Sequence, residues 1–306
     1  MRYPTGVQDF EKIIEGNYVY VDKTDLVYEL TKENVCFLSR PRRFGKSLLI
    51  STLDYYFKGK RELFEGLKIA DLEKEWVEYP VFRIDFAAGK FGEPNVLNNI
   101  LEEYINQWES IYGRNPYGNE LEYRFKYVLE QAEKKTGHKA VVLIDEYDKP
   151  LLDPLGEEQE IVNRNILRSF YGTFKSADAH LRFVLLTGVT KFSQITVFSG
   201  FNQANDLTMD SKYDAICGIT TEELHTVFAE PIRELAEEME YTEEEMKLEL
   251  KRQYDGYHFS RELLDIYNPF SLTIAEYVVI PNQPSIGHTK LIQPFDSPLK
   301  LFGHAE

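Results

Sequence analysis

A hydrophobic run followed by a glycine, a lysine and a serine is the first place where this chain could do chemistry. Residues 35–39 have the composition of a buried strand, and the loop after them ends in Gly45, Lys46 and Ser47. Glycine permits a close backbone approach, lysine reaches the β and γ phosphates, and a serine hydroxyl can ligate Mg²⁺. This order predicts a phosphate-binding loop that leads into an amphipathic helix over residues 48–57.

The loop departs from the general phosphate-loop motif at one position. The motif G-x-x-x-x-G-K-[ST] has a glycine where this chain has Arg40. A basic loop before an ordinary helix is therefore the alternative interpretation. For Arg42 and Arg43, contact with phosphate, with a neighbouring subunit or with an acidic surface all remain open. The candidate nucleotide-binding residues are Arg42, Arg43, Phe44, Gly45, Lys46, Ser47 and Leu48.

A second hydrophobic strand ends in two adjacent carboxylates. Residues 141–144 are all apolar, and Asp145 and Glu146 follow them directly. In this Walker B form the first carboxylate holds Mg²⁺, directly or through water, and the second polarises the water that attacks the γ-phosphate. We expect Ser47 and Asp145 to hold the metal, and Glu146 and Lys46 to be catalytic. The alternative is an acidic pair that only ends a strand and caps a helix.

A third apolar run, residues 181–187, ends in the polar side chain of Thr187. In nucleotidases with an additional central strand, a polar residue at the tip of that strand contacts the γ-phosphate or the attacking water. Thr187 is therefore the third candidate catalytic residue, and a threonine that merely ends a strand is the alternative.

The elements that would position these residues follow the α/β pattern. The runs that begin at Ala140 and Leu181 are nearly continuous in apolar residues, which favours central strands covered on both faces. Apolar residues recur at three- and four-residue steps over 96–108 and 121–129, which predicts amphipathic helices. We expect a mostly parallel sheet between helices, with strands at residues 35–39, 80–86, 140–145 and 181–187.

The second half of the chain has a different pattern. A shorter strand is expected at 215–219, followed by a capping box over 220–223 and one helical face from Leu224 to Leu235. From there the pattern is helical only, and the segment 254–258 is interpreted as a turn whose aromatic residues pack. We predict a first domain over residues 1–218, a small second domain over 219–271, and a proline-rich extended tail over 272–306.

Charge and cysteine content exclude several classes of protein. The formal net charge is −16, and residues 222–250 alone hold 11 acidic and 2 basic residues. A chain of this kind does not coat nucleic acid through bulk charge. Cys36 and Cys217 match no metal-ligand spacing and are expected to be small core residues. No apolar run approaches the roughly 18 residues of a membrane span, so we expect a cytoplasmic protein without a membrane partner.

The motifs together resemble those of the bacterial and archaeal AAA-ATPase-like proteins. Their phosphate loop reads RPRRFGKS, as residues 40–47 do here, so arginine in place of the first glycine is the form of that family. The resemblance covers about residues 1–271. The further blocks that match in family order are residues 6–10, 20–24, 63–67, 144–148, 187–190, 254–257 and 267–271.

This resemblance implies a P-loop NTPase fold with an additional central strand, followed by a small helical or winged lid, and it makes ATP the expected nucleotide. It allows the segment around Asp22 and Lys23 to line the nucleotide site, although helix capping is the role that we favour for them. Members commonly continue into a domain similar to PD-(D/E)xK nucleases. Because residues 273–306 are proline-rich and lack an acidic cluster, we expect that domain to be absent and the chain to be a truncated or frame-altered member.

Two functions remain open at this stage. The favoured one is a Mg²⁺-dependent ATPase that hydrolyses ATP to ADP and phosphate. The other is a nucleotide-dependent switch with little turnover, which requires self-association or an unknown protein partner for activation. Direct DNA binding or cleavage is a weak third interpretation, because the nuclease-like domain is expected to be absent and most of the lid is acidic. Nucleic acid would be reached only indirectly if at all. Glu146 separates the first two, since its replacement should abolish hydrolysis and spare ATP binding.

Overall fold

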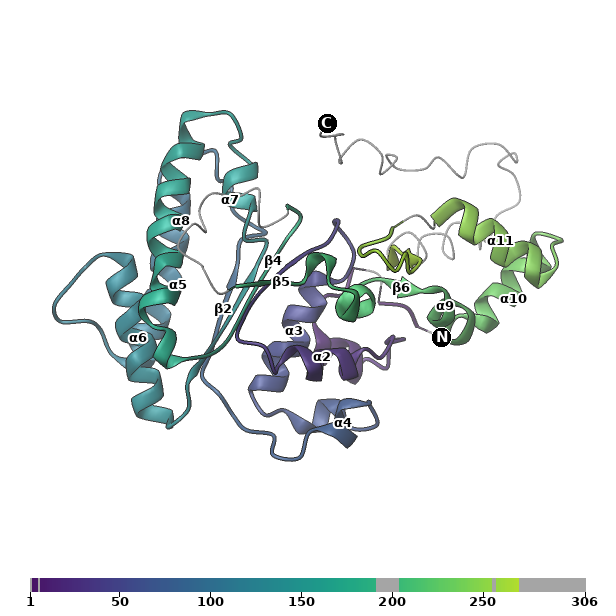
Figure 1. Ribbon diagram of the computed structural model, residues 1–306, viewed down its shortest axis with the longest axis horizontal. Coiled ribbons are helices and arrows are strands. Elements are labelled where there is room, and N and C mark those ends of the chain that lie inside the picture. The colour runs from purple at the N-terminus through teal and green to yellow at the C-terminus, as the bar shows by residue number, and fades with distance from the viewer. Residues whose placement is uncertain (1, 5, 191–203, 255–256, 270–306) are drawn as a thin grey trace.

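Five parallel strands form the sheet at the centre of the molecule, in the order β2-β3-β4-β1-β5 (Figure 1). This computed structural model describes residues 2–4, 6–190, 204–254 and 257–269. The strand β4 lies between β1 and β3, so an additional strand separates the phosphate-loop strand from the acidic strand. The expected α/β, P-loop NTPase-like fold is confirmed. The strands are β1 Val35–Ser39, β2 Val81–Asp85, β3 Ala140–Asp145, β4 Leu181–Gly188 and β5 Asn205–Asp206.

Both predicted central strands are confirmed by their burial. Every residue of β3 is buried, and so are the last six of β4. The register pairs Val142 with Val184 and Phe37 with Leu186, so the carboxyl ends of β1, β3 and β4 lie at one edge of the sheet. The catalytic and metal candidates therefore meet at that edge.

Two layers of helices cover the sheet, because alternate residues of each strand point to opposite faces. On one face, Val142 and Ile144 pack under α5, α6 and α8, and on the other, Val141 and Leu143 pack under α1, α2 and α3 (Figure 1). The predicted amphipathic helices are confirmed as α5 and α6. The bounds are α1 Phe10–Glu15, α2 Thr24–Leu30, α3 Lys46–Phe57, η1 Arg61–Phe64, α4 Ile69–Leu72, α5 Val96–Tyr112, α6 Leu121–Thr136, α7 Lys149–Leu152, α8 Glu158–Ser176 and η2 Asp178–His180.

Residues 207–254 and 257–269, called here the C-terminal segment, differ from prediction. The strand expected at 215–219 is wrong except at Ile219, where β6 begins, because residues up to Ile216 form a 3-10 helix whose first turn is capped by the side chain of Asp210. The helical-only prediction is also wrong, because β6 pairs with β7 in a separate antiparallel sheet. The elements are η5 Leu207–Met209, η6 Ser211–Ile216, β6 Ile219–Thr220, α9 Thr221–Val227, α10 Ala229–Glu238, α11 Glu243–Tyr254 and β7 Ile266–Tyr267.

The predicted capping box is confirmed, but the helix after it is broken. Thr220 and Glu223 exchange both capping hydrogen bonds at the start of α9. The single face predicted from Leu224 to Leu235 is divided at Phe228, between α9 and α10. Pro231 explains the break, because a proline in the interior of a longer helix would clash with the carbonyl four residues earlier. In the first turn of α10 the same proline is tolerated.

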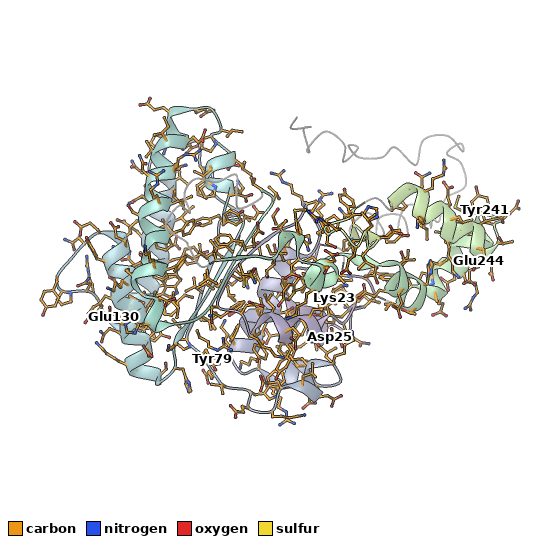
Figure 2. The ribbon with its side chains drawn as sticks, in the orientation of Figure 1. Lys23, Asp25, Tyr79, Glu130, Tyr241 and Glu244 are labelled. Carbon is orange, nitrogen blue, oxygen red and sulfur yellow. The ribbon has the colours of Figure 1, made fainter. Side chains whose placement is uncertain are left out.

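Within the C-terminal segment, the acidic residues of α10 are exposed, whereas Asp214 in η6 is buried. In Figure 2, Tyr241 and Glu244 project from the tip of this segment, far from Glu130 on α6. Both Cys36 and Cys217 are free and buried, as expected of core residues. Across the part of the chain that the structure describes, no helix combines the length and apolarity of a membrane span. The division into domains stays a prediction, and the tail over 272–306 lies outside the described residues.

Candidate functional site

The loop between β1 and α3 turns at two residues with positive φ. These are Arg43, at φ 66°, and Gly45, at φ 96°. A side chain is strained in this region and glycine is not. A Cβ atom on Gly45 would meet nothing within 4 Å, so backbone conformation and not crowding requires the glycine. The turn leaves backbone N–H groups at the start of the twelve-residue helix α3. Such groups form a cradle for an anion.

Lys46 is the cation inside this loop. Its side chain is 6% exposed, and Nζ donates hydrogen bonds to the carbonyl oxygens of Arg40 and Pro41, each at 3.0 Å. Burial lowers the pKa of Lys46, while the thiol of Cys217 and the carboxylate of Asp145 act in the opposite direction. A buried lysine of this kind would gain from an anionic ligand, because the ligand would offset its loss of hydration.

Arg40, which stands where the general motif has glycine, faces away from the loop. The side chain is 1% exposed, and its Nη atoms donate to the carbonyl oxygens of Thr208, at 2.9 Å, and Tyr213, at 3.0 Å. The guanidinium also lies 3.9 Å from the ring centre of Phe259. Burial lowers the pKa of Arg40, and Cys217 and two aspartates oppose that effect. Arg40 therefore anchors the loop to the C-terminal segment.

Phe44 anchors the loop to the same segment. Its ring is buried and makes edge contacts with Tyr257, at 4.7 Å between ring centres, and with Phe259, at 5.6 Å. Its carbonyl oxygen accepts a hydrogen bond from Gly218 N, at 3.0 Å. The packing role expected for the aromatic residues of 254–258 is confirmed for Tyr257. Arg42 and Arg43, by contrast, are exposed.

Asp145, the last residue of β3, and Glu146, which follows it, are called here the acidic edge. Asp145 comes first. This side chain is buried, and its Oδ1 accepts hydrogen bonds from the hydroxyl of Thr187, at 2.6 Å, and from Glu146 N, at 3.1 Å. Since β3 and β4 are neighbours, strand pairing alone brings Thr187 to Asp145. The hydroxyl proton of Thr187 is used in this contact, and the predicted contact with the γ-phosphate or attacking water stays a prediction.

Glu146 follows with a left-handed backbone, at φ 53°. Strained conformations of this kind cluster at functional sites. Burial is the largest cause that raises the pKa of Glu146, and the charge of Asp145 adds to it, while Lys46 opposes both. The effects of these charges on one another indicate that Lys46, Asp145 and Glu146 share one site. A carboxylate with a raised pKa is suited to accept a proton.

The donor set at this edge fits Mg²⁺. Asp145 offers carboxylate oxygens, and Ser47, half-buried in the first turn of α3, offers a hydroxyl. Mg²⁺ is commonly bound through one or two carboxylates together with substrate phosphates and water. Among residues 2–190, 204–254 and 257–269 that are described, no cluster of three His, Cys, Asp or Glu side chains could cage a metal alone. The site thus suits a metal that arrives with a phosphate ligand.

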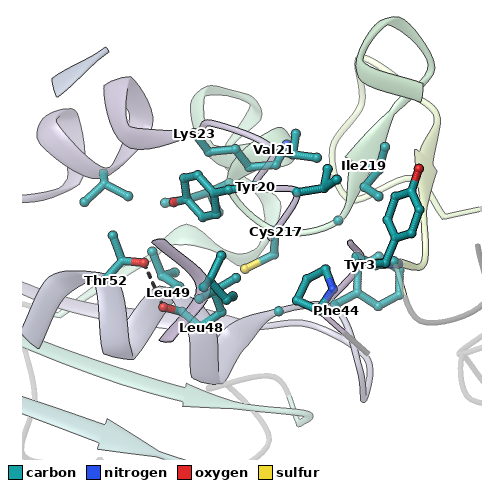
Figure 3. A pocket seen from close by; sticks show the side chains of 18 of the residues that line it. Tyr3, Tyr20, Val21, Lys23, Phe44, Leu48, Leu49, Thr52, Cys217 and Ile219 are labelled. Atoms are coloured by element: carbon teal, nitrogen blue, oxygen red, sulfur yellow. Dashed lines mark hydrogen bonds between the residues drawn. The ribbon is translucent and has the colours of Figure 1, made fainter. Parts of the chain in front are cut away.

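An apolar pocket adjoins the loop and was missed by sequence reasoning. Figure 3 shows Tyr20 and Val21 on one side of it, Leu48 and Leu49 on the other, and Cys217 between them. It holds about 790 Å³ of empty space, part of it open to solvent. The other residues that line the pocket are Tyr3, Pro4, Ile13, Val19, Lys23, Val27, Phe44, Gly45, Thr52, Ile216, Gly218, Ile219, Phe228 and Pro269.

An ion pair ties the two walls of this pocket together. Lys23 Nζ donates to both carboxylate oxygens of Glu223, at 2.8 and 2.7 Å, and Glu223 is also the capping residue of α9. Burial lowers the pKa of Lys23, and Glu223 opposes that effect. The capping prediction is confirmed for Asp22, which accepts from Thr24 N at 2.9 Å, and is wrong for Lys23, which makes no capping bond.

Sequence reasoning and structure agree on one part of the site. The structure brings Lys46, Asp145, Glu146 and Thr187 to one end of the sheet, and it puts Leu48 on the pocket wall. The roles given to these residues remain predictions. The pocket as a whole carries no spaced motif, because its lining comes from four separate parts of the chain, residues 3–27, 44–52, 216–228 and Pro269. The matched family blocks over 20–24, 40–47 and 267–271 each contribute lining residues.

Comparisons with known proteins give a family and one relative. A protein-family model described as "Predicted AAA-ATPase" matches residues 4–198. A curated protein from Azotobacter chroococcum mcd 1, described as "Uncharacterized protein in vnfD 5'region", is 39% identical over 277 residues. That match covers 89% of this chain and 51% of the relative, so the chain spans about half the length of the protein it matches. No solved structure was found to match the chain.

Proposed function

The chain belongs to the predicted AAA-ATPase family, because the family model covers residues 4–198, and from this premise we propose that it hydrolyses Mg²⁺-bound ATP to ADP and phosphate. The observation that carries the proposal is the shared position of a buried lysine and two carboxylates at one end of the sheet. The charges of Lys46, Asp145 and Glu146 each affect the pKa of a neighbour in this group. A cation for phosphate and a base for water are thus close together.

Each residue at this end has a chemical task in the proposal. The backbone N–H groups after Gly45 and the ammonium of Lys46 bind phosphate oxygens, while Ser47 and Asp145 are the residues that would hold Mg²⁺. Bound Mg²⁺ would neutralise charge on the β- and γ-phosphate oxygens. A carboxylate oxygen of Glu146 accepts a proton from the water that attacks the γ-phosphate, which its raised pKa favours.

The apolar pocket supports a nucleotide as the ligand in place of a simple phosphate. Gly45 and Leu48 belong both to the phosphate loop and to the pocket wall, so a base in the pocket lies within reach of phosphates on the loop. Its walls are mainly aliphatic and aromatic, as is usual for small-molecule sites. We assign the base of ATP to this pocket.

A nucleotide-dependent switch with slow turnover is the second candidate. It is favoured by the anchoring of the loop, because Arg40 and Phe44 both pack on the C-terminal segment. Any shift of the loop on ATP binding would then move that segment. Exposed Arg42 would remain available to a partner or a second copy in either case.

Phosphate release from ATP tests the proposal and separates the two candidates. The purified chain should release phosphate in the presence of Mg²⁺ and stop when EDTA is added. Glu146→Gln keeps the shape of the side chain but cannot accept the proton, so turnover should fall by about 10²–10⁴-fold. The matched control is Glu158→Gln, at an exposed position in the first turn of α8, which should keep wild-type turnover.

Each outcome of these measurements supports or refutes a different candidate function. Equal turnover in the Glu146 and Glu158 variants would refute the role given to Glu146. ATP binding without phosphate release by the wild-type chain would favour the switch. Absence of ATP binding would remove both candidates.

A further inference from the structure

A buried carboxylate that the proposed chemistry does not use lies next to the acidic edge. Asp148 is 1% exposed, and its Oδ2 accepts hydrogen bonds from Val189 N, at 2.9 Å, and Thr190 N, at 2.6 Å. Although Asp148 occupies the N-cap position of α7, its side chain makes no capping bond. Its carboxylate is therefore committed to the turn that follows β4. Hydrogen bonds to an ionised acceptor are about twice as strong as neutral ones.

Tyr147 forms hydrogen bonds to both ends of the same turn, at Thr187 and at Thr190. Its backbone N–H donates to the carbonyl oxygen of Thr187, at 3.0 Å, and its hydroxyl donates to the carbonyl oxygen of Thr190, at 2.6 Å. With the two bonds to Asp148, four hydrogen bonds join residues 147–148 to residues 187–190. The turn consequently has one position relative to the end of β3.

The close approach of Asp148 to this turn is also visible at Gly188. A Cβ atom at that position would lie 2.7 Å from Asp148 Oδ1 and 2.7 Å from Tyr147 Cε1, distances too short for any side chain. Gly188 does not have a positive φ, so the contact and not the backbone conformation requires glycine here. The carboxylate of Asp148 thus packs directly on the backbone of the turn.

The turn links the two halves of the proposed site. On the side of the phosphate loop, Gly188 O accepts from Arg40 N at 3.1 Å, and Val189 O accepts from the hydroxyl of Ser39 at 3.2 Å. On the acidic side, the hydroxyl of Thr187 donates to Asp145 Oδ1 at 2.6 Å. A displacement of this turn would alter both the loop backbone and the contact that orients Asp145.

We propose that Asp148 is a positioning residue for the reaction: by fixing the turn after β4 it holds Thr187 against Asp145 and so sets the orientation of the Asp145 carboxylate. The expected losses of rate and of Mg²⁺-dependent affinity rest on the proposed function, in which Asp145 would hold Mg²⁺. The geometric claim concerns residues of this chain alone. Asp148 itself touches no reacting atom in this account.

Substitution of Asp148 gives the direct test. Asp148→Ala leaves two N–H groups of the turn without their acceptor, and a displacement of about 1 Å at a reacting centre can cost roughly 10²-fold in rate. We expect kcat to fall by about that factor and the Mg²⁺ concentration for half-maximal turnover to rise. Asp148→Asn keeps an oxygen acceptor and should recover most of the loss. The control Asp153→Ala, near the same short helix and paired with Lys149, should change neither quantity.

A second readout does not depend on turnover. In a Glu146→Gln background, the Kd for ATP is measured by calorimetry with and without Mg²⁺. When Asp148→Ala is added, the gain in affinity from Mg²⁺ should shrink by about tenfold, or 1.4 kcal/mol. An unchanged gain would overturn the inference even if the variant were less stable. If the wild-type chain bound ATP but did not hydrolyse it, this readout would still decide the inference, while the proposed hydrolysis would fail.

A double substitution that includes Thr187 gives the last test. If Asp148 acts through Thr187, the variant that combines Asp148→Ala with Thr187→Val should lose no more of the Mg²⁺-dependent affinity than the more severe single variant. Residues that act independently give additive losses. Additive losses, or wild-type Mg²⁺ dependence in Asp148→Ala, would overturn the proposal.

Discussion

The phosphate loop and the acidic edge lie at the same end of the sheet but are held in place in different ways. Asp145 is oriented by Thr187, which sits on the neighbouring strand, so strand pairing supplies the contact. Arg40 instead donates to the carbonyl oxygens of Thr208 and Tyr213, which lie outside the main sheet. These two residues are 168 and 173 positions further along the chain. Phe44 depends on the same distant segment.

The two regions therefore depend on different parts of the fold for their geometry. The acidic edge is held in place by the pairing of the buried strands β3 and β4. The loop takes its shape from the C-terminal segment, so loosening that segment should loosen the loop and leave the edge intact. Conversely, a ligand that reshapes the loop acts on the C-terminal segment, which is the physical basis for the switch considered above.

Removal of Phe44 should give the largest effect on stability. Phe44→Ala deletes a fully buried ring that packs on Tyr257 and Phe259, and changes of this kind cost about 3–5 kcal/mol in the free energy of unfolding. The measurement is urea unfolding followed by fluorescence. The control Tyr117→Ala removes a 93% exposed ring and should stay within about 0.5 kcal/mol of wild type. A Phe44 variant as stable as this control would show that the loop does not depend on the distant packing.

Filling the apolar pocket should give a smaller effect, confined to nucleotides. Val21→Phe puts a ring into the space assigned to the base, and we expect ATP binding to weaken by at least about tenfold, or 1.4 kcal/mol. Inorganic tripolyphosphate, which has no base, should bind this variant as it binds wild type. Calorimetry measures both, with Val162→Phe, at an exposed position on α8, as the control. Equal weakening of ATP and tripolyphosphate would remove the base from this pocket.

The smallest expected effect concerns the charge of Glu146. Because its pKa is raised in the folded chain, the fold favours its neutral form, and the stability that this gives is lost as pH rises through the folded pKa. Glu146→Gln should therefore raise Tm at pH 7.5 by roughly 1–3 °C, and the difference should vanish below the unfolded pKa of about 4.3. Calorimetric scans at both pH values check this. A lower Tm for the variant at pH 7.5 would contradict the sign.

Much of the fold could be predicted from the sequence because its signals are local. Continuous apolar runs identified β3 and β4, and periodic spacing identified α5 and α6. The prediction failed at residues 215–219, where an apolar run of strand length divides into the end of a 3-10 helix, a bend and the first residue of β6. Capping of that helix by Asp210 and the positive φ of Gly218 decide its shape, and apolar composition does not reveal either.

The residues of the site also divide into those that the sequence could predict and those that it could not. Lys46, Asp145 and Glu146 belong to motifs in which residue type and spacing carry the chemistry, so they were identified as candidates directly. The pocket and the anchoring of Arg40 depend on contacts between segments up to about two hundred positions apart, such as Lys23 with Glu223. Single side chains that meet only through tertiary packing leave no periodic or spaced pattern in one sequence.

One measurement tests the central claim, that phosphates of ATP bind at the loop, most directly. In a Glu146→Gln background, ATP with Mg²⁺ is titrated into protein carrying Lys46→Ala or, as the matched control, Lys58→Ala, the C-cap residue of the same helix. Lys58 is exposed and paired with Asp54 at the far end of α3. The account predicts that the Lys46 variant loses at least about tenfold in affinity, or 1.4 kcal/mol, and that the Lys58 variant loses none. Equal Kd values in the two variants would contradict it.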